Sequence, residues 1–521
     1  MLRRPFPRLR STLDPATLRA VVRLALPVVA ANLLQTMVNA VDVFLAGRLG
    51  PLEVAAVGIA VSVRLLILVV VMAVTAGAMA LAAQAKGARD PGALHDVTRQ
   101  TLLLSAVLSL VLTAVGTLVA RPMMTFLNAD GPAFVVDAGT SYLTILFLGT
   151  TLLVAQMALT SLMQGAGDTV TPLWLGGATN LANVLFSWLF MFGPGPFPAL
   201  GVPGAAVGTV LARGVGLALT LAAIASGRNV IRWPAGPWRW NAPRVRDLLA
   251  IGVPSGLQSL AYTVAGFLVV RAVTATPSGS YGAAAMAIGL QIEGFAFMPG
   301  VAISVAATSL VGQALGAWQP RAAWRAGHAA LATAVALMGA VGVVLIVAAE
   351  PLVRAFDPSA HPVVIADGTA YLRINGAVQP ILAVFMVLNG ALRGAGDVRA
   401  GLWGTVVGRW AVVVPLAWLL GAWGPWGTTG VWWAFFAGLT VQAAWVAERW
   451  RRGAWLQVAL QRSQVWRVHL HRLEEAQRRA FLDGVREPAM SVDGTREVVT
   501  TLDVRYEREG SVVARWAPPG A

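Results

Sequence analysis

The sequence predicts an all-α polytopic membrane protein whose twelve transmembrane helices form two parallel-repeat six-helix lobes. Only 12% of the 521 residues are charged and the mean hydropathy is +0.69, whereas a soluble domain carries about 25% charged residues. Apolar runs longer than the roughly 18 residues needed to cross a bilayer recur along the chain. The second half also repeats the first at a constant offset of 229 residues.

Apolar runs between proline, glycine and arginine residues define the twelve expected spans. Those of the first half cover 24–46, 53–82, 97–119, 134–159, 170–192 and 201–225. Those of the second half cover 247–273, 283–311, 324–348, 363–389, 401–422 and 430–449. We therefore expect an N-lobe at 24–226, a linker at 227–246 and a C-lobe at 247–450, with end segments at 1–23 and 451–521.

Arginine and lysine residues are divided unequally between the connections. Twelve belong to the even-numbered connections, which include the 227–246 linker, and three belong to the odd-numbered ones: Arg48, Arg121 and Arg354. Cationic residues stay on the cytoplasmic side of a membrane. We therefore expect a multi-pass protein of the inner (plasma) membrane with both termini and the linker in the cytoplasm. The formal charge of +15 then reflects topology, and no nucleic-acid partner is expected.

The internal repeat is visible in short matched segments. AQAKGARDP (83–91) aligns with GQALGAWQP (312–320), and QGAGDT (164–169) aligns with RGAGDV (393–398). Six helices per half is an even number, so both halves enter the membrane from the same side and the repeat is parallel. Such a duplication predicts a transport path between the two halves.

Five motifs carry a resemblance to a known family. They are VNAVDVFLAGRLG (38–50), QGAGDTVTP (164–172), ALGVPGAAVGT (199–209), FMPGVAISVAATSLVGQALGA (297–317) and LRGAGD (392–397). Because these motifs occur together and in this order, the chain resembles the multidrug and toxin extrusion (MATE) family over about residues 20–450. The resemblance implies two lobes around a V-shaped cleft and an antiporter that exports drug-like cationic or amphipathic organic compounds in exchange for H⁺ or Na⁺.

Asp42 is the first candidate for coupling to a cation. A carboxylate inside a span costs several kcal/mol unless it is paired, hydrated or protonated. A desolvated carboxyl group favours its protonated form, which suits proton binding and release, and the family places its first-lobe acid here. The alternative is an aspartate near an interfacial turn that only caps or pairs.

The fifth expected span supplies polar partners for this carboxyl group. Asn180 and Asn183 are present, but Ser187 stands where family members with an acidic pair carry the second acid. Asparagines inside spans also serve simply to hold helices together. The seventh span has Gln258 and Tyr262 and no acid at the position that another branch uses for sodium. Both departures favour H⁺ over Na⁺ as the coupling ion.

Arg64 and Glu293 occupy equivalent positions of the two halves with opposite charge. Unpaired charges facing lipid are costly, so we expect both to face the cleft and to pair or to meet substrate. The alternative is that each extends its charged end to the outer interface. Further candidates for lining the cleft are Tyr142, Gln35, Gln258 and Tyr262.

Other classes of function are less compatible with the sequence. A lipid-linked oligosaccharide or lipid flippase of the same superfamily would need a more cationic cleft. A major-facilitator transporter would need an Asp-Arg-rich second inner loop, which QAKGARDPG does not match. The sequence has no cysteine and no nucleophile–base pair, metal cluster or nucleotide motif, so we expect no enzyme, no metal and no cofactor beyond the coupling ion. We expect a monomer whose partners are small organic molecules and the bilayer.

Overall fold

A computed structural model describes residues 14–128, 131–227, 229–234, 236–356, 361–462, 503–506 and 512–515. Most of the predicted end segments 1–23 and 451–521 therefore lies outside the described residues. The side chains of several residues of the second helix, Arg64 among them, also lie outside the description.

Helices build the first half of the chain. They are α1 (Pro15–Gly47), α2 (Pro51–Gly87), α3 (Pro91–Leu127), α4 (Ala133–Leu148), α5 (Thr150–Gly165), α6 (Val170–Phe192) and α7 (Val202–Ala225). Proline at the first helical position begins α1, α2 and α3, where its missing N–H would have no intrahelical partner in any case. Asp14 and Asp90 precede α1 and α3 and accept a hydrogen bond from a first-turn N–H.

The second half follows the same plan. Its helices are α8 (Ala242–Thr274), α9 (Gly279–Gly316), α10 (Pro320–Val347), α11 (Ala349–Phe356), α12 (Pro362–Gly394), α15 (Gly427–Arg451) and α16 (Ala454–Arg462). The eleventh expected span is a composite of α13 (Arg399–Thr405), η2 (Val406–Val413), α14 (Val414–Leu416) and η3 (Ala417–Ala422). Both η segments have π-helical turns, a rare geometry that often accompanies functional sites.

Ten helices in the described part of the chain are long and apolar enough to span a membrane, or eleven if α4 and α5 count as one span bent by 51°. The prediction of twelve exceeds this number by one or two. Helix α2 fills the remaining expected position, because it is 37 residues long and has no charged residue between Arg64 and Lys86. The fold class is confirmed as a helical membrane protein.

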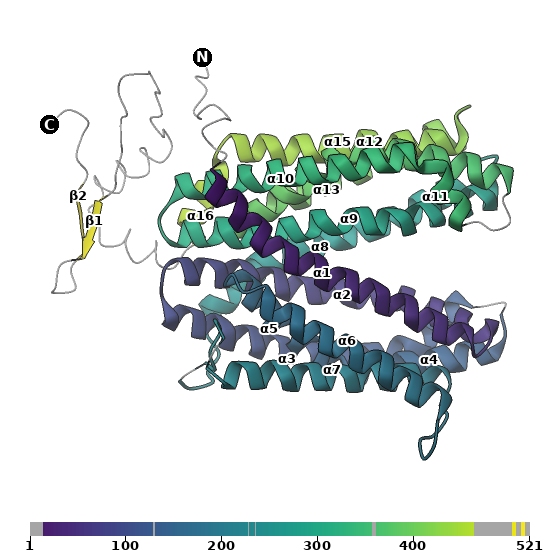
Figure 1. Cartoon of the computed structure of the whole chain (residues 1–521), viewed down its shortest axis with the longest axis horizontal. Helices are drawn as coiled ribbons and strands as arrows, with labels where there is room; N and C mark the ends of the chain where they lie inside the picture. Colours follow the sequence, from purple (N-terminus) through teal and green to yellow (C-terminus); the bar gives the residue numbers. More distant parts are fainter. Residues whose placement is uncertain are drawn as a thin grey trace.

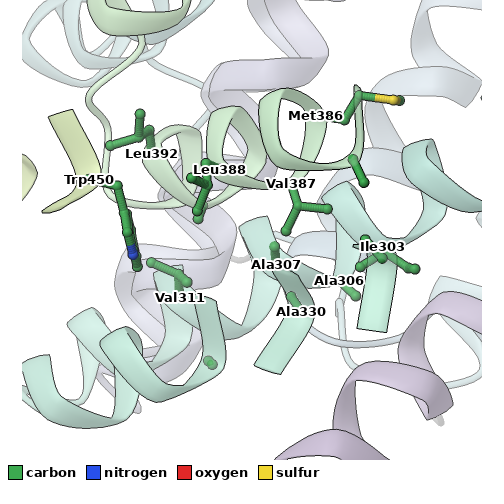
Figure 2. Packing of buried hydrophobic residues seen from close by; sticks show 14 of the residues in the cluster. Ile303, Ala306, Ala307, Val311, Ala330, Met386, Val387, Leu388, Leu392 and Trp450 are labelled. Atoms are coloured by element: carbon green, nitrogen blue, oxygen red, sulfur yellow. The ribbon is translucent and has the colours of Figure 1, made fainter. Parts of the chain in front are cut away.

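Figure 1 shows the two halves as neighbouring layers, with α1 running obliquely across both. Val21, Ala25 and Val28 of α1 pack in a core of the second half with residues of α9, α10 and α12, whereas Leu45 and Ala46 pack in a core of the first half. Figure 2 shows part of the former core, where buried residues of α9, α10, α12 and α15 meet. Helix α1 thus contributes to both halves.

The two ends of the bundle differ. We call the end that carries the turns at 165–168 and 394–397 the GAGD end, and the opposite end the far end. At the GAGD end Gly167 and Gly396 have φ of +89° and +84°, a conformation that glycine adopts without steric cost. Asp168 accepts from the N–H of Thr171 in the first turn of α6. Asp397 instead binds Arg449 Nε at 2.7 Å.

The halves meet along a seam near the GAGD end. An added Cβ at Gly87 would lie 1.9 Å from the Gln313 carbonyl oxygen, and one at Gly316 would lie 2.0 Å from the Gln84 carbonyl oxygen. Both glycines are therefore required for close approach. The two contacts are equivalent under the offset of 229 residues. The seam is therefore pseudo-symmetric.

In the C-terminal tail, β1 (Asp503–Tyr506) pairs antiparallel with β2 (Val512–Arg515). The residues that join the two strands lie outside the described part of the chain.

Candidate functional site

A cavity of about 690 Å³ lies between the two halves. Its walls come from α1, α2, α5, α6 and α7 of the first half and from α8, α9, α12, the α13–η2 segment and α15 of the second half. The seam lies on its GAGD side. Both halves therefore contribute to one cavity, as the duplication predicts.

The wall from the first half holds a chain of polar side chains. Gln156 of α5 donates to the Thr179 hydroxyl at 2.9 Å, and its amide oxygen accepts from Arg213 at 3.4 Å. Asn180 lies beside Thr179 in sequence and also lines the cavity. Gly216 leaves room for this chain, because an added Cβ would lie 2.2 Å from both Gln156 and Thr179.

The wall from the second half holds a charged cluster. The Glu293 carboxylate of α9 accepts a short hydrogen bond from the Tyr371 hydroxyl of α12. The Arg409 guanidinium lies 4.1 Å from the centre of the Tyr262 ring and 5.3 Å from that of Phe435, within the range of cation–π attraction. Arg409 is 8% exposed, and its Nε has no hydrogen-bond partner in the described structure. Arg409 therefore retains unused hydrogen-bond capacity at the cavity wall.

Amide side chains of both halves also line the cavity. Gln258 donates to the Thr405 hydroxyl at 3.0 Å, and its amide oxygen accepts from Asn389 at 3.4 Å. On α1, Gln35 donates to Asn39 at 3.2 Å. Gln35, Gln258 and Tyr262 all line the cavity.

Two glutamines join the halves at the seam below the cavity. Gln84 of α2 donates to the Gly394 carbonyl oxygen at 2.9 Å, and Gln313 of α9 donates to the Gly165 carbonyl oxygen at 3.1 Å. Both donors and both acceptors are related by the offset of 229 residues. The two bonds therefore form a reciprocal pair across the seam.

Arg393 lies beside this pair and lines the cavity together with Gln164, its equivalent in the first half. No described residue forms a hydrogen bond or an ion pair with its guanidinium. Arg393 is in the last turn of α12, where the helix dipole favours a cation by about 0.3–1 kcal/mol. Sequence reasoning missed Arg393 because it lies inside the LRGAGD motif, which indicates a structural turn.

Among the coupling candidates of the first half, Asn180 lines the cavity and Asp42, Asn183 and Ser187 do not. Asn183 donates to the Thr209 hydroxyl at 3.1 Å, and Ser187 is fully buried between α6 and α7. Half-buried Asp42 lies five residues before the end of α1 at Gly47. An added Cβ at Gly177 of α6 would lie 3.9 Å from Leu34 of α1.

Because α1 and α6 run toward the same end and rise about 1.5 Å per residue, this contact places Asp42 near the level of Asn183 and Ser187. Asp42 lies in the last two turns of α1, which also agrees with the alternative of an aspartate near the outer interface.

Two predicted cleft residues are not among the described residues that line the cavity. Tyr142 is 5% exposed and packs in the core of the first half with Leu143 and Phe147. The Arg64 side chain lies outside the description, so its proposed pairing with Glu293 stays a prediction. Glu293 itself lines the cavity, and its neighbour is Arg409 of its own half.

The MatE family model matches residues 27–189 and 254–419, which is more than half of the chain. The chain belongs to the MatE family. It is 31% identical over 443 residues to "Probable multidrug resistance protein NorM" of Bradyrhizobium diazoefficiens, covering 82% of this chain and 92% of that protein. It is 26% identical over 419 residues to the NorM protein of Thermotoga maritima, covering 80% and 89%.

Among solved structures, a multidrug resistance MATE family transporter in an outward-facing conformation matches with a TM-score of 0.79 and 22% identity, covering 88% of this chain and 99% of that one. This likeness supports the MatE fold.

Proposed function

We propose that this MatE protein is a secondary active antiporter that exports drug-like amphipathic organic compounds by alternating access of its two lobes. The observation that carries this proposal is the cavity of about 690 Å³ shared by both lobes and bounded on one side by the pseudo-symmetric seam. Ligand sites of transporters built from repeats lie between the repeats. The names of the relatives, which refer to multidrug resistance, support the same function.

The distribution of arginines assigns the membrane sides. The lobes cover 24–226 and 247–450. The positive-inside rule puts the GAGD end, the linker 227–246 and both termini in the cytoplasm. The seam then closes the cytoplasmic side, so the described state is outward-facing. Opening the seam while the far end closes would present the cavity to the cytoplasm. The protein acts as a monomer in this proposal, because each lobe supplies half of the cavity.

We assign the coupling ion as H⁺ and the coupling carboxyl group as Asp42, with Asn180, Asn183 and Ser187 as its polar surroundings. Ser187 stands where family members with an acidic pair carry the second acid, and the seventh span has no acid at the position that another branch uses for sodium. Both departures favour H⁺. A carboxyl group set among neutral amides and a hydroxyl gains and loses one proton more readily than it collects the several oxygen ligands of a metal cation.

The test is dye efflux from proteoliposomes under imposed H⁺ or Na⁺ gradients, with wild type compared with Asp42→Asn. We expect an H⁺ gradient to drive efflux in wild type and not in the variant. Asp137→Asn is the matched control, because Asp137 is an exposed carboxylate of α4 that pairs with Arg121. Equal gradient-driven efflux in wild type and Asp42→Asn would refute the assignment of Asp42.

A lipid flippase is the second candidate, because three arginines line the cavity: Arg213, Arg393 and Arg409. Scrambling of a fluorescent phospholipid in the same vesicles separates the two functions. Lipid movement without dye efflux would replace the drug antiporter by the flippase.

A further inference from the structure

We propose that the cavity binds amphipathic anions, through arginines from both lobes, and that cations of the same size are excluded. The proposal rests on the proposed transport function and specifies its substrate class. The resemblance to the family implies cationic or amphipathic compounds. The charges of this cavity favour amphipathic anions over cations.

The charge balance of the cavity is positive. The described residues that line it include three arginines, Arg213, Arg393 and Arg409, and one carboxylate, Glu293. Asp42 does not line the cavity. With every group ionised, the described lining carries a net charge of +2, and protonation of Glu293 would raise it to +3. The positive charge of the lining would therefore repel a cationic substrate.

The one carboxylate is already engaged. Glu293 accepts a hydrogen bond from Tyr371 and lies in the electrostatic field of Arg409. It can therefore offset one arginine at most. Arg393 has no hydrogen bond or ion pair with any described residue, and Arg409 has a buried Nε without an acceptor. Acceptors for these donors must come from water or from a ligand.

The arginines are distributed over the two lobes in a pattern that follows the repeat. Arg213 of the N-lobe is equivalent to Gln442 of the C-lobe, and Asn180 of the N-lobe is equivalent to Arg409. At one of these positions the N-lobe has an arginine and the C-lobe has an amide, and at the other position the reverse holds. All four residues line the cavity. The cavity therefore offers hydrogen-bond donors from both lobes to an anion.

The rest of the cavity is suited to an apolar body. Phe297, Phe385 and Met157 line it, together with Leu290 and Val301. Guanidinium groups bind carboxylate, sulfonate and phosphate in a planar two-point geometry. The chemistry points to a single anionic group on an apolar body. A free organic acid and an anionic phospholipid share this chemistry.

The experiment uses two dyes with one body and opposite charges, dansylglycine (a carboxylate) and dansylethylenediamine (an ammonium). Binding to the purified full-length protein and efflux from proteoliposomes are measured for both. We expect wild type to bind and export dansylglycine about tenfold or more in preference to the cation. Arg393→Gln and Arg409→Gln should each weaken dansylglycine binding by about tenfold, the effect of one lost charge-assisted hydrogen bond. Neither variant should weaken binding of the cation, because each removes one positive charge that repels it.

Arg399→Gln is the matched control, because Arg399 is exposed and does not line the cavity. A preference of wild type for the cation, or equal losses for both dyes in the cavity variants, would overturn the proposal. Binding of dansylglycine without efflux of either dye would refute the transport function and uphold the anion site. A dansylglycine preference together with scrambling of a fluorescent phosphatidylglycerol would identify the anion as a lipid.

Discussion

Replacement of both seam glutamines should open the GAGD end. Gln84 and Gln313 each donate one hydrogen bond across the seam to a glycine carbonyl oxygen of the other lobe. The net value of such a bond is about 1 kcal/mol. Gln84→Ala combined with Gln313→Ala should therefore destabilise the closed seam by about 2 kcal/mol, a shift of roughly thirtyfold toward the open form. If the closed form exceeds the open form by about a hundredfold in wild type, the open form should reach about a quarter of the population.

Spin labels can measure this shift. Lys86 and Arg321 are exposed at the GAGD end of α2 and α10, and the chain has no cysteine to remove. Labels at Lys86→Cys and Arg321→Cys should give one short distance in the wild-type background. A second, longer distance should appear in the double variant.

Gln291→Ala is the control for this experiment, because Gln291 is an exposed glutamine of α9 remote from the seam. Each single variant should give about half of the free-energy change. An unchanged distance distribution in the double variant would refute the reasoning, and so would the same change in Gln291→Ala.

Three further changes test other parts of the structure. Gly316→Ala should also open the seam, since its Cβ would lie 2.0 Å from the Gln84 carbonyl oxygen, and the same label pair would report it; an unchanged distance would contradict the close contact. Asp397→Asn removes the 2.7 Å ion pair with partly exposed Arg449 and should lower the free energy of unfolding by about 1–3 kcal/mol, measured by thermal unfolding in detergent. Trp450→Ala removes a 2% exposed ring from the core and should cost about 3–5 kcal/mol in the same assay; a loss below 1 kcal/mol would contradict its packing.

The repeat made much of the fold predictable from sequence. The positions of the spans follow from apolar length, and a cavity shared by both halves follows from matches at one offset. Glu293 was a candidate for the cleft because charged groups in spans are costly unless they face water or each other, and Glu293 lines the cavity.

Other features depend on tertiary contacts that a local pattern does not contain. Helix α1 contributes to both lobes because its apolar surface is long enough to meet two cores in succession. The π-helical turns of η2 and η3 lie on either side of Pro415 in α14, and a proline inside a span predicts a kink without specifying π-helical turns. Tyr142 was a candidate for lining the cleft, yet it packs in a core of the first half, whereas its repeat equivalent Tyr371 lines the cavity.

The accessibility of one cavity residue tests the central claim most directly. Thr160 lines the cavity and is half-buried, and Thr160→Cys would be the sole thiol of the chain. A membrane-impermeant maleimide is added to each side of oriented vesicles, with and without a transported dye. The account predicts that the thiol reacts from the extracellular side and that the dye slows the reaction. Reaction from the cytoplasmic side alone, or at a rate that the dye does not change, would contradict an outward-facing substrate cavity between the lobes.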